Sequence, residues 1–126
     1  MTNETLVLRQ VHPSFIQAGR VTSQVFRPTP KDLGRLSGYD GDQIDAEKAF
    51  AHYTTELEFE SAGVLAVTVA ECKEIELTVE PDPKPFPEHV VIVFHGLTDN
   101  QSEKKSKKLN ARAATRGWLY QPPASD

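Results

Sequence analysis

The stretch VLAVTV, residues 64–69, is the most apolar run in the chain, and VVIVF, residues 90–94, resembles it closely. Short continuous apolar runs are typical of strands that are covered on both faces. We therefore predict two buried strands here, with residues 64–69 at the centre of a sheet. The predicted core consists of Val64, Leu65, Val67, Val69, Val91, Ile92, Val93 and Phe94.

Shorter segments around these runs alternate apolar and polar residues, a pattern that predicts strands with one covered face. They are residues 5–11, 21–26, 57–60 and 76–80, and residues 118–120 could add a last strand. Residues 27–42 contain two prolines and three glycines and show no sustained period. We therefore expect a long loop over 27–42.

Helical spacing occurs in two places. Apolar side chains recur every three or four residues over 46–54, with Asp45 as a suitable N-cap. Residues 100–116 contain no glycine or proline, with Asp99 or Asn100 as the cap and Gly117 as the stop. Residues 70–74 could form one further helical turn.

These elements predict an α+β fold, with a mixed, largely antiparallel sheet of about five strands and two helices. A chain of 126 residues suits one domain, which we expect to span residues 1–126. Its ordered core should cover about residues 5–120, and the polar, proline-containing end at 121–126 should fray.

Composition narrows the classes of function. The chain has 18 acidic and 14 basic residues, a net charge of -4, so a surface-wide footprint for nucleic acid is not expected. It has no apolar run near the roughly 18 residues of a membrane span and no signal-peptide core, so we expect no membrane contact and a cytoplasmic location. A lone cysteine, Cys72, excludes an internal disulfide and suits a small buried side chain.

The motifs of common cofactor and hydrolase sites are missing from the sequence. It contains no GxGxxG, Walker A or GxSxG pattern. Its four histidines, His12, His52, His89 and His95, show none of the HxH, HxxxH or HExxH spacings. We therefore expect no metal and no cofactor.

Four polar residues could form a catalytic set if the fold brings them together. They are Arg9, His12, Ser23 and His89. Arginine holds phosphate in a bidentate fashion, and two histidines can act as acid and base near neutral pH. The alternative is structural: His12, which precedes a proline, would then hydrogen-bond within a turn.

The same region carries a resemblance. Residues 8–13 (LRQVHP), 19–28 (GRVTSQVFRP) and 82–89 (DPKPFPEH) resemble a group of small uncharacterised bacterial proteins with LRxxHP, GxxTSxxFxP and DPxPFPEH stretches. The resemblance spans about residues 6–120 and implies a bacterial, cytoplasmic, free-standing domain, with no activity to carry over. The order of Arg9, Thr22-Ser23 and a later acidic residue also resembles compact ADP-ribosyltransferases, although no Q/ExE-type motif follows.

Basic residues are concentrated near the C-terminus. Residues 98–126 carry a net charge of +3 (6 basic, 3 acidic) and residues 1–97 a net charge of -7 (8 basic, 15 acidic). The predicted contact residues are Lys104, Lys105, Lys108, Arg112 and Arg116, beside an apolar stripe of Leu109, Ala113, Ala114 and Trp118. This ridge either pairs with the acidic strands of the same molecule or meets an anionic partner.

Two classes of function follow. The first is a soluble accessory or interaction domain that binds another macromolecule partly through its basic C-terminal helix. A protein is then the expected partner, nucleic acid is less favoured, and the oligomeric state stays open. The alternative is a compact enzyme that acts on a phosphate-containing substrate through Arg9, His12 and His89, by phosphodiester cleavage or ADP-ribosyl-type transfer.

Overall fold

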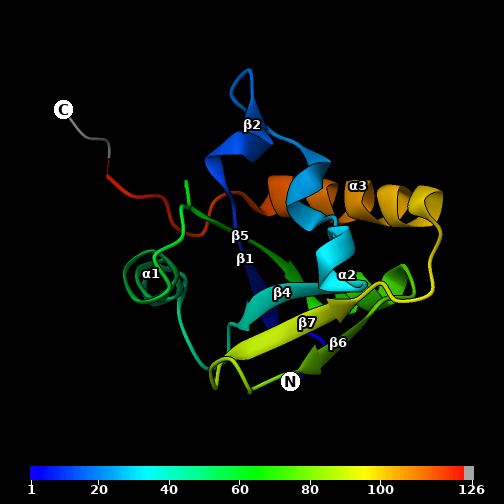
Figure 1. Ribbon diagram of the computed structural model, residues 1–126, viewed down its shortest axis with the longest axis horizontal. Helices are drawn as coiled ribbons and strands as arrows, with labels where there is room; N and C mark the ends of the chain where they lie inside the picture. The colour runs from blue at the N-terminus through cyan, green and yellow to red at the C-terminus, as the bar shows by residue number, and fades with distance from the viewer. Residues whose placement is uncertain (124–126) are drawn as a thin grey trace.

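A five-stranded antiparallel sheet organises the computed structural model, which describes residues 1–123 (Figure 1). Its strand order is β5-β1-β4-β7-β6. The strands are β1 (Leu6–Gln10), β4 (Arg35–Asp40), β5 (Val64–Thr68), β6 (Thr78–Pro81) and β7 (His89–Val93). A separate two-stranded ribbon joins β2 (Ile16–Gln17) to β3 (Arg20–Val21). The expected α+β fold with a largely antiparallel sheet is confirmed.

The helical segments are of three kinds. The α-helices are α1 (Ala46–Ala51), α2 (Val69–Glu74) and α3 (Asp99–Arg116). A π-helical turn, His52–Glu56, continues α1. Short 3-10 turns lie at η1 (Pro13–Phe15), η2 (Ser23–Phe26) and η3 (Pro30–Asp32). None of the described helices is both long enough and apolar enough to cross a membrane.

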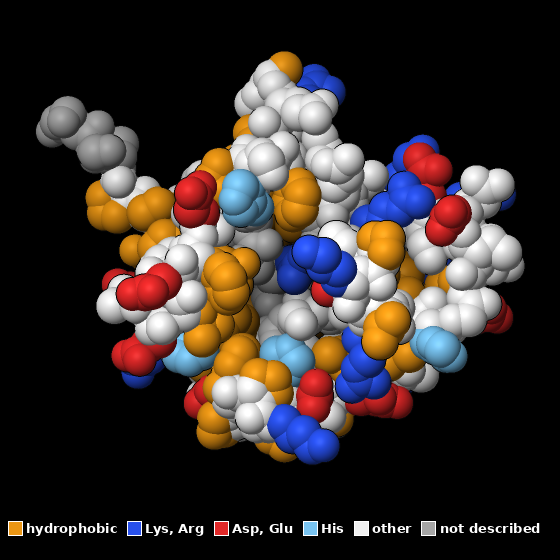
Figure 2. All heavy atoms as spheres, in the orientation of Figure 1, with side chains coloured by type: hydrophobic (Ala, Val, Ile, Leu, Met, Phe, Trp, Pro, Cys, Tyr) orange, Lys and Arg blue, Asp and Glu red, His pale blue; other side chains and the backbone are white. Residues whose placement is uncertain are grey.

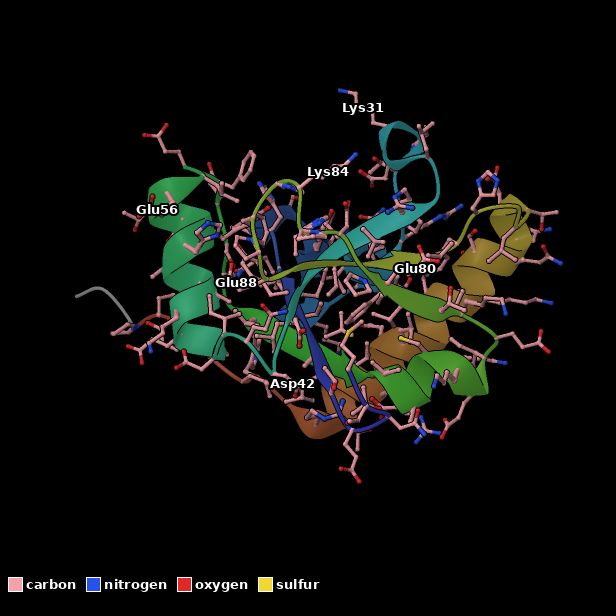
Figure 3. All side chains as sticks on the ribbon, turned by 90° about the horizontal axis from the view of Figure 1, so that it is seen from below. Lys31, Asp42, Glu56, Glu80, Lys84 and Glu88 are labelled. Carbon is pink, nitrogen blue, oxygen red and sulfur yellow. The ribbon has the colours of Figure 1, made fainter. Side chains whose placement is uncertain are left out.

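The sheet is covered on both faces, because successive side chains of a strand point to opposite sides. Val7 belongs to the core under α2, α3 and η2, whereas its neighbour Leu8 packs toward α1. Viewed from below, α1 stands on one side of the sheet and α2 and α3 on the other (Figure 3). The predicted core is buried as expected, except that Val93 is half-buried.

The prediction that residues 64–69 lie at the sheet centre is wrong. β5 stands at one end of the strand order and pairs with β1 alone among the sheet strands. Its outer edge is covered by the C-terminal segment, through hydrogen bonds between Val64 and the backbones of Leu119 and Tyr120. β5 is apolar because helices cover both its faces. The strand expected at 118–120 is reduced to one bridge, Val64 to Tyr120.

The expected loop over 27–42 is also wrong in its second half, because β4 is the middle strand of the sheet. Its sequence, RLSGYD, lacks a regular apolar pattern. Gly38 allows close contact with β1: a Cβ there would lie 2.9 Å from Val7 Cγ1 and 3.0 Å from the Leu8 carbonyl oxygen. β4 is a strand because it contacts both neighbouring strands, and its local sequence does not predict those contacts.

Two other predicted strands are absent. Only Val21 of residues 21–26 belongs to a strand, and the chain then turns through η2, which buries Val25 and Phe26. Residues 57–60 form no strand. Glu58 has φ 59°, a left-handed conformation incompatible with a strand, and the N–H of Phe59 returns to the carbonyl of Tyr53.

The long C-terminal helix differs in detail from the expected one. Its N-cap is Thr98, which exchanges hydrogen bonds with Gln101, rather than Asp99 or Asn100. Gly117, with φ 84°, ends it as expected. Ser106, Leu109 and Ala113 form the buried stripe, and Ala114 is exposed because it lies about 100° further round the helix than Ala113. Of the frayed end predicted at 121–126, residues 124–126 lie outside the described residues.

Candidate functional site: a cleft between the sheet and α1

A cleft of about 490 Å³ opens on the α1 side of the sheet, between the π-helical turn and the β6–β7 loop. Figure 2 shows this hollow, with hydrophobic side chains gathered along its α1 side. Its aromatic walls come from Tyr39, Tyr53, Phe59 and Phe86. Its polar lining consists of Arg9, Gln10, Asp32, Ser37 and His89.

The cleft exists because β1 and β4 separate. They pair only at Val7–Asp40 and Leu8–Tyr39, whereas β1 pairs with β5 along its whole length. The guanidinium of Arg9 fills the gap: Nε donates to the Val25 carbonyl at 2.8 Å and Nη1 to the Ser37 carbonyl at 2.9 Å.

Arg9 carries a positive charge in the cleft with no carboxylate partner among residues 1–123. Burial lowers the pKa of Arg9, and the charges of Tyr53 and Asp32 act against that shift. A guanidinium nevertheless stays protonated in proteins. Asp32 also lines the cleft, but its carboxylate is hydrogen-bonded to Thr29, because Oδ2 accepts from both the N–H and the hydroxyl of that residue. Arg9 is thus available to an anion.

Gln10, the next residue along β1, supplies a second free donor. Its side chain is buried, with 6% of the residue exposed, and Oε1 accepts from Ser61 Oγ at 2.7 Å. Its Nε2 has no hydrogen-bond partner within the described chain. An unsatisfied buried donor costs about 1–3 kcal/mol, which a ligand acceptor would recover.

His89 links two further polar groups at the floor of the cleft. Its Nε2 lies 3.0 Å from Ser37 Oγ, and its Nδ1 lies 2.8 Å from the Asp82 carbonyl and 3.5 Å from Asp82 Oδ2. A carbonyl can only accept, so Nδ1 carries the proton. With this proton on Nδ1, Nε2 is the ring nitrogen that can accept from the Ser37 hydroxyl.

The aromatic side chains form a connected wall. Tyr39 and Phe86 stack with centroids 4.9 Å apart, and Tyr53 and Phe59 meet at 5.1 Å. The Tyr39 hydroxyl lies 2.8 Å from His52 Nδ1. Burial, followed by the charges of Tyr53 and Glu88, raises the pKa of Tyr39 above its ordinary value, so this phenol stays neutral. The wall therefore offers flat, uncharged surface to a planar group.

The structure brings together half of the predicted catalytic set. Arg9 and His89 line the cleft, whereas His12 and Ser23 are not among its lining residues. His12 is exposed and caps η1, where its Nδ1 accepts from the Ser14 N–H at 3.0 Å. Ser23 is the first residue of η2, two residues before Val25, whose carbonyl accepts from Arg9 Nε. The geometry of His12 fits the structural alternative.

Sequence reasoning missed three polar residues that line the cleft, Gln10, Asp32 and Ser37, and also Asp82, which contacts His89. Ser37 lies in the stretch expected to be a loop, so nothing placed it opposite a strand. Asp82 belongs to the DPKPFPEH segment, whose prolines favour an extended chain but do not show that it folds back beside His89. The hydrogen bond between Ser37 and His89 joins residues 52 positions apart.

The predicted contact residues of α3 are mostly engaged within the molecule. Arg112 pairs with Glu74 at 2.9 Å, and Arg116 bonds Glu71 and the Ala66 carbonyl, both at 2.9 Å. Lys105 donates to the Ile75 carbonyl. Their partners thus lie on or beside α2 and on β5. Lys104 and Lys108 are exposed and form no ion pair within the described part of the chain.

Metal ligands do not gather in the fold: across residues 1–123, no group of three or more His, Cys, Asp or Glu side chains could hold a metal ion. Comparisons with protein-family models, curated proteins and solved structures found no match.

Proposed function

We propose that this protein binds a small ligand with a planar ring and an anionic group in the cleft. The observation that carries the proposal is the buried, unpartnered amide of Gln10, which lines the same cleft as Arg9, an arginine without a carboxylate partner in the described residues. The atoms that these two groups leave free can donate hydrogen bonds but cannot accept them. The site therefore favours a ligand rich in acceptor atoms.

The size and walls of the cleft support the same ligand class. Its volume of about 490 Å³ lies within the range of roughly 300–1,000 Å³ of small-molecule sites. The pair Tyr39 and Phe86 supplies a stacked aromatic surface against which a ring can pack. Carboxylate and phosphate both suit the guanidinium.

Isothermal titration calorimetry with 2-naphthoate tests the proposal. We expect binding of 2-naphthoate, and much weaker binding of 2-naphthylmethanol, which lacks the charge, and of decanoate, which lacks the ring. Equal affinity for all three would contradict the proposed selectivity.

A matched pair of variants locates the binding site. Gln10→Glu replaces the free donor by a carboxylate of the same size and should reduce 2-naphthoate affinity at least about tenfold, or about 1.4 kcal/mol. Gln17→Glu makes the same charge change on exposed β2 and should leave affinity unchanged. Equal losses in the two variants would mean that the ligand binds elsewhere.

A second candidate, binding of an acidic macromolecule through α3, is favoured by the two exposed lysines Lys104 and Lys108. They are four residues apart and therefore adjacent on the helix surface. Fluorescence anisotropy with labelled poly-glutamate tests it: the double change Lys104→Glu and Lys108→Glu should abolish salt-sensitive binding. The control changes are Lys48→Glu on α1 and Lys84→Glu on the β6–β7 loop, and they should leave binding unchanged; Lys84 is labelled in Figure 3.

A further inference from the structure

We propose that Ser37 is a nucleophile for acyl transfer and that the cleft hydrolyses esters of planar aromatic groups. The inference rests on the proposed ligand site, because the ester would occupy the same cleft. The inference adds a reaction to the binding site. It also assigns a chemical role to the hydrogen-bonded series formed by Ser37, His89 and Asp82, which ligand binding alone does not require.

The hydrogen bonds of this series run from nucleophile to base to orienting group. Ser37 Oγ lies 3.0 Å from His89 Nε2, within the reach required of a nucleophile and its general base. The opposite ring nitrogen is fixed by the Asp82 carbonyl at 2.8 Å, with Asp82 Oδ2 at 3.5 Å. The carboxylate is close enough to favour the imidazolium that forms when His89 takes a proton.

The proposed nucleophile is exposed and the proposed base is buried, as the reaction requires. Ser37 is exposed and lines the cleft, so a substrate can reach its hydroxyl. His89 is 7% exposed and fixed at both nitrogens, so its ring cannot turn away. Such fixed positioning of a base beside an accessible hydroxyl is how an active site lowers the entropic part of its barrier.

Donors for the developing oxyanion lie beside the nucleophile. Arg9 Nη1 is bonded to the carbonyl of Ser37 itself, which places the guanidinium next to this residue. Leu8 and Tyr39 are paired across β1 and β4. Gln10 lies two residues after Leu8, and Ser37 lies two residues before Tyr39. Gln10 and Ser37 therefore point to the same face of the sheet. The unpartnered Gln10 Nε2 is therefore the second donor.

The reaction consumes only the ester and water. Ser37 Oγ attacks the ester carbonyl carbon while His89 Nε2 accepts the hydroxyl proton. The tetrahedral intermediate collapses, the carbon–oxygen bond to the leaving group breaks, and His89 returns the proton to that oxygen. Water then attacks acyl-Ser37 with His89 again as base, and the acid is released as the proton returns to Ser37 Oγ.

The experiment uses 2-naphthyl acetate, followed by the fluorescence of released 2-naphthol. Ser37→Ala and His89→Asn should each lower kcat/KM at least about 100-fold. The chain offers a matched control, because Ser14 Oγ and His12 Nδ1 form a similar pair at 2.8 Å outside the cleft. Ser14→Ala and His12→Asn should leave kcat/KM unchanged. Equal losses from the two pairs would overturn the proposal.

A second measurement is made on the wild-type protein, so it does not depend on whether a variant folds. Intact-mass analysis after rapid acid quench should detect an acetyl adduct, and peptide mapping should place it on Ser37. An adduct on another residue, or hydrolysis without one in folded protein, would overturn the assignment. If Ser37→Ala does not fold, Ser37→Cys preserves a nucleophile, and its thiol should carry the adduct.

The two proposals can fail separately. Binding of 2-naphthoate to the wild-type protein without hydrolysis of the ester would overturn the acyl-transfer proposal and leave the binding site in place. Hydrolysis that depends on Ser37, without 2-naphthoate binding, would support the catalytic series and overturn the proposed anionic ligand class.

Discussion

His12 and His89 show how neighbouring groups decide what one type of side chain does. His12 is exposed, caps a short turn, and lies 3.8 Å from Glu60. His89 is buried at a strand end, with one nitrogen on a backbone carbonyl and the other on a hydroxyl. His89 directs a nitrogen at a hydroxyl that lines the cleft, whereas the pair of His12 with Ser14 lies outside it, so His89 is the better placed for chemistry.

Cys72 illustrates the opposite case, a thiol that burial in the fold makes unreactive. Burial, with a smaller effect from the charge of Glu71, raises the pKa of the Cys72 thiol from 9.0 to about 12. Because the thiolate is the reactive form, we expect iodoacetamide at pH 8 to alkylate the native protein far more slowly than the urea-unfolded chain. Mass spectrometry of timed samples measures both rates, and similar rates would show that the thiol is accessible.

The same shift has a consequence for stability. The folded pKa of Cys72 lies above the unfolded value, so its contribution is complete below pH 9 and is lost as the pH rises from 9 toward 12. Cys72→Ala should show a smaller loss of unfolding free energy over that range than the wild-type protein. Urea titrations at several pH values compare the two.

At the scale of elements, α2 and α3 are joined through Glu71. Burial alone would raise its pKa, but hydrogen bonds from Arg116 and from the Thr68 N–H, together with the charges of Arg116 and Arg112, lower it below 4.5. The folded pKa is thus below the unfolded one, so this contact stabilises the protein above about pH 4.5 and is lost as the pH falls through the folded pKa.

Substitution at Glu71 tests that contact. We expect Glu71→Gln to lower the melting temperature at pH 7 and to flatten its decrease on acidification. Glu47→Gln, an exposed change in the first turn of α1, serves as the control and should follow the wild-type curve. If both variants follow it, Glu71 does not couple folding to pH.

The covering of the β5 edge depends on one glycine. Gly63 has φ 151°, and a Cβ there would lie 2.6 Å from the Tyr120 carbonyl oxygen and 2.9 Å from the Trp118 ring. Gly63→Ala should therefore destabilise the protein by about 1–3 kcal/mol, as overpacking does. Gly19→Ala, with φ 76° and no atom within 4 Å of the added methyl, imposes backbone strain without a clash. Urea denaturation should show the larger loss for Gly63→Ala.

At the scale of the whole molecule, the cleft joins segments that are distant in sequence. Its lining comes from β1, η3, β4, the π-helical turn with the loop that follows it, the β6–β7 loop and the start of β7. A ligand that binds only the assembled cleft should stabilise the whole domain. At a concentration 100 times its Kd, 2-naphthoate should raise the unfolding free energy by about 2.7 kcal/mol.

Differential scanning calorimetry provides the measurement for this prediction. The melting temperature should rise with 2-naphthoate and stay constant with decanoate at the same concentration. Calorimetric binding at 25 °C without any rise in melting temperature would indicate that the unfolded chain binds the ligand equally well.

Several elements were determined by local sequence alone. The apolar runs at 64–69 and 90–94 formed β5 and β7, except that Val69 begins α2 and Phe94 follows β7, and the uninterrupted stretch at 100–116 became a helix that ends at Gly117. These signals are strong because burial on both faces, or a long run of helix formers, leaves the chain few alternatives. The identity of most core residues followed from the same signals.

Tertiary structure decided the rest, including the whole candidate site. β4 is a strand because β1 and β7 supply its hydrogen-bonding partners, although its own sequence contains a glycine and few apolar residues. β5 stands at the end of the sheet, where the C-terminal segment covers its outer edge at Val64. Ser37 meets His89 only because β4 pairs with β7, and Arg9 reaches Ser37 only because β1 leaves β4 after Leu8. Such contacts depend on strand order and register, which are fixed by the free energy of the assembled sheet rather than by any local pattern.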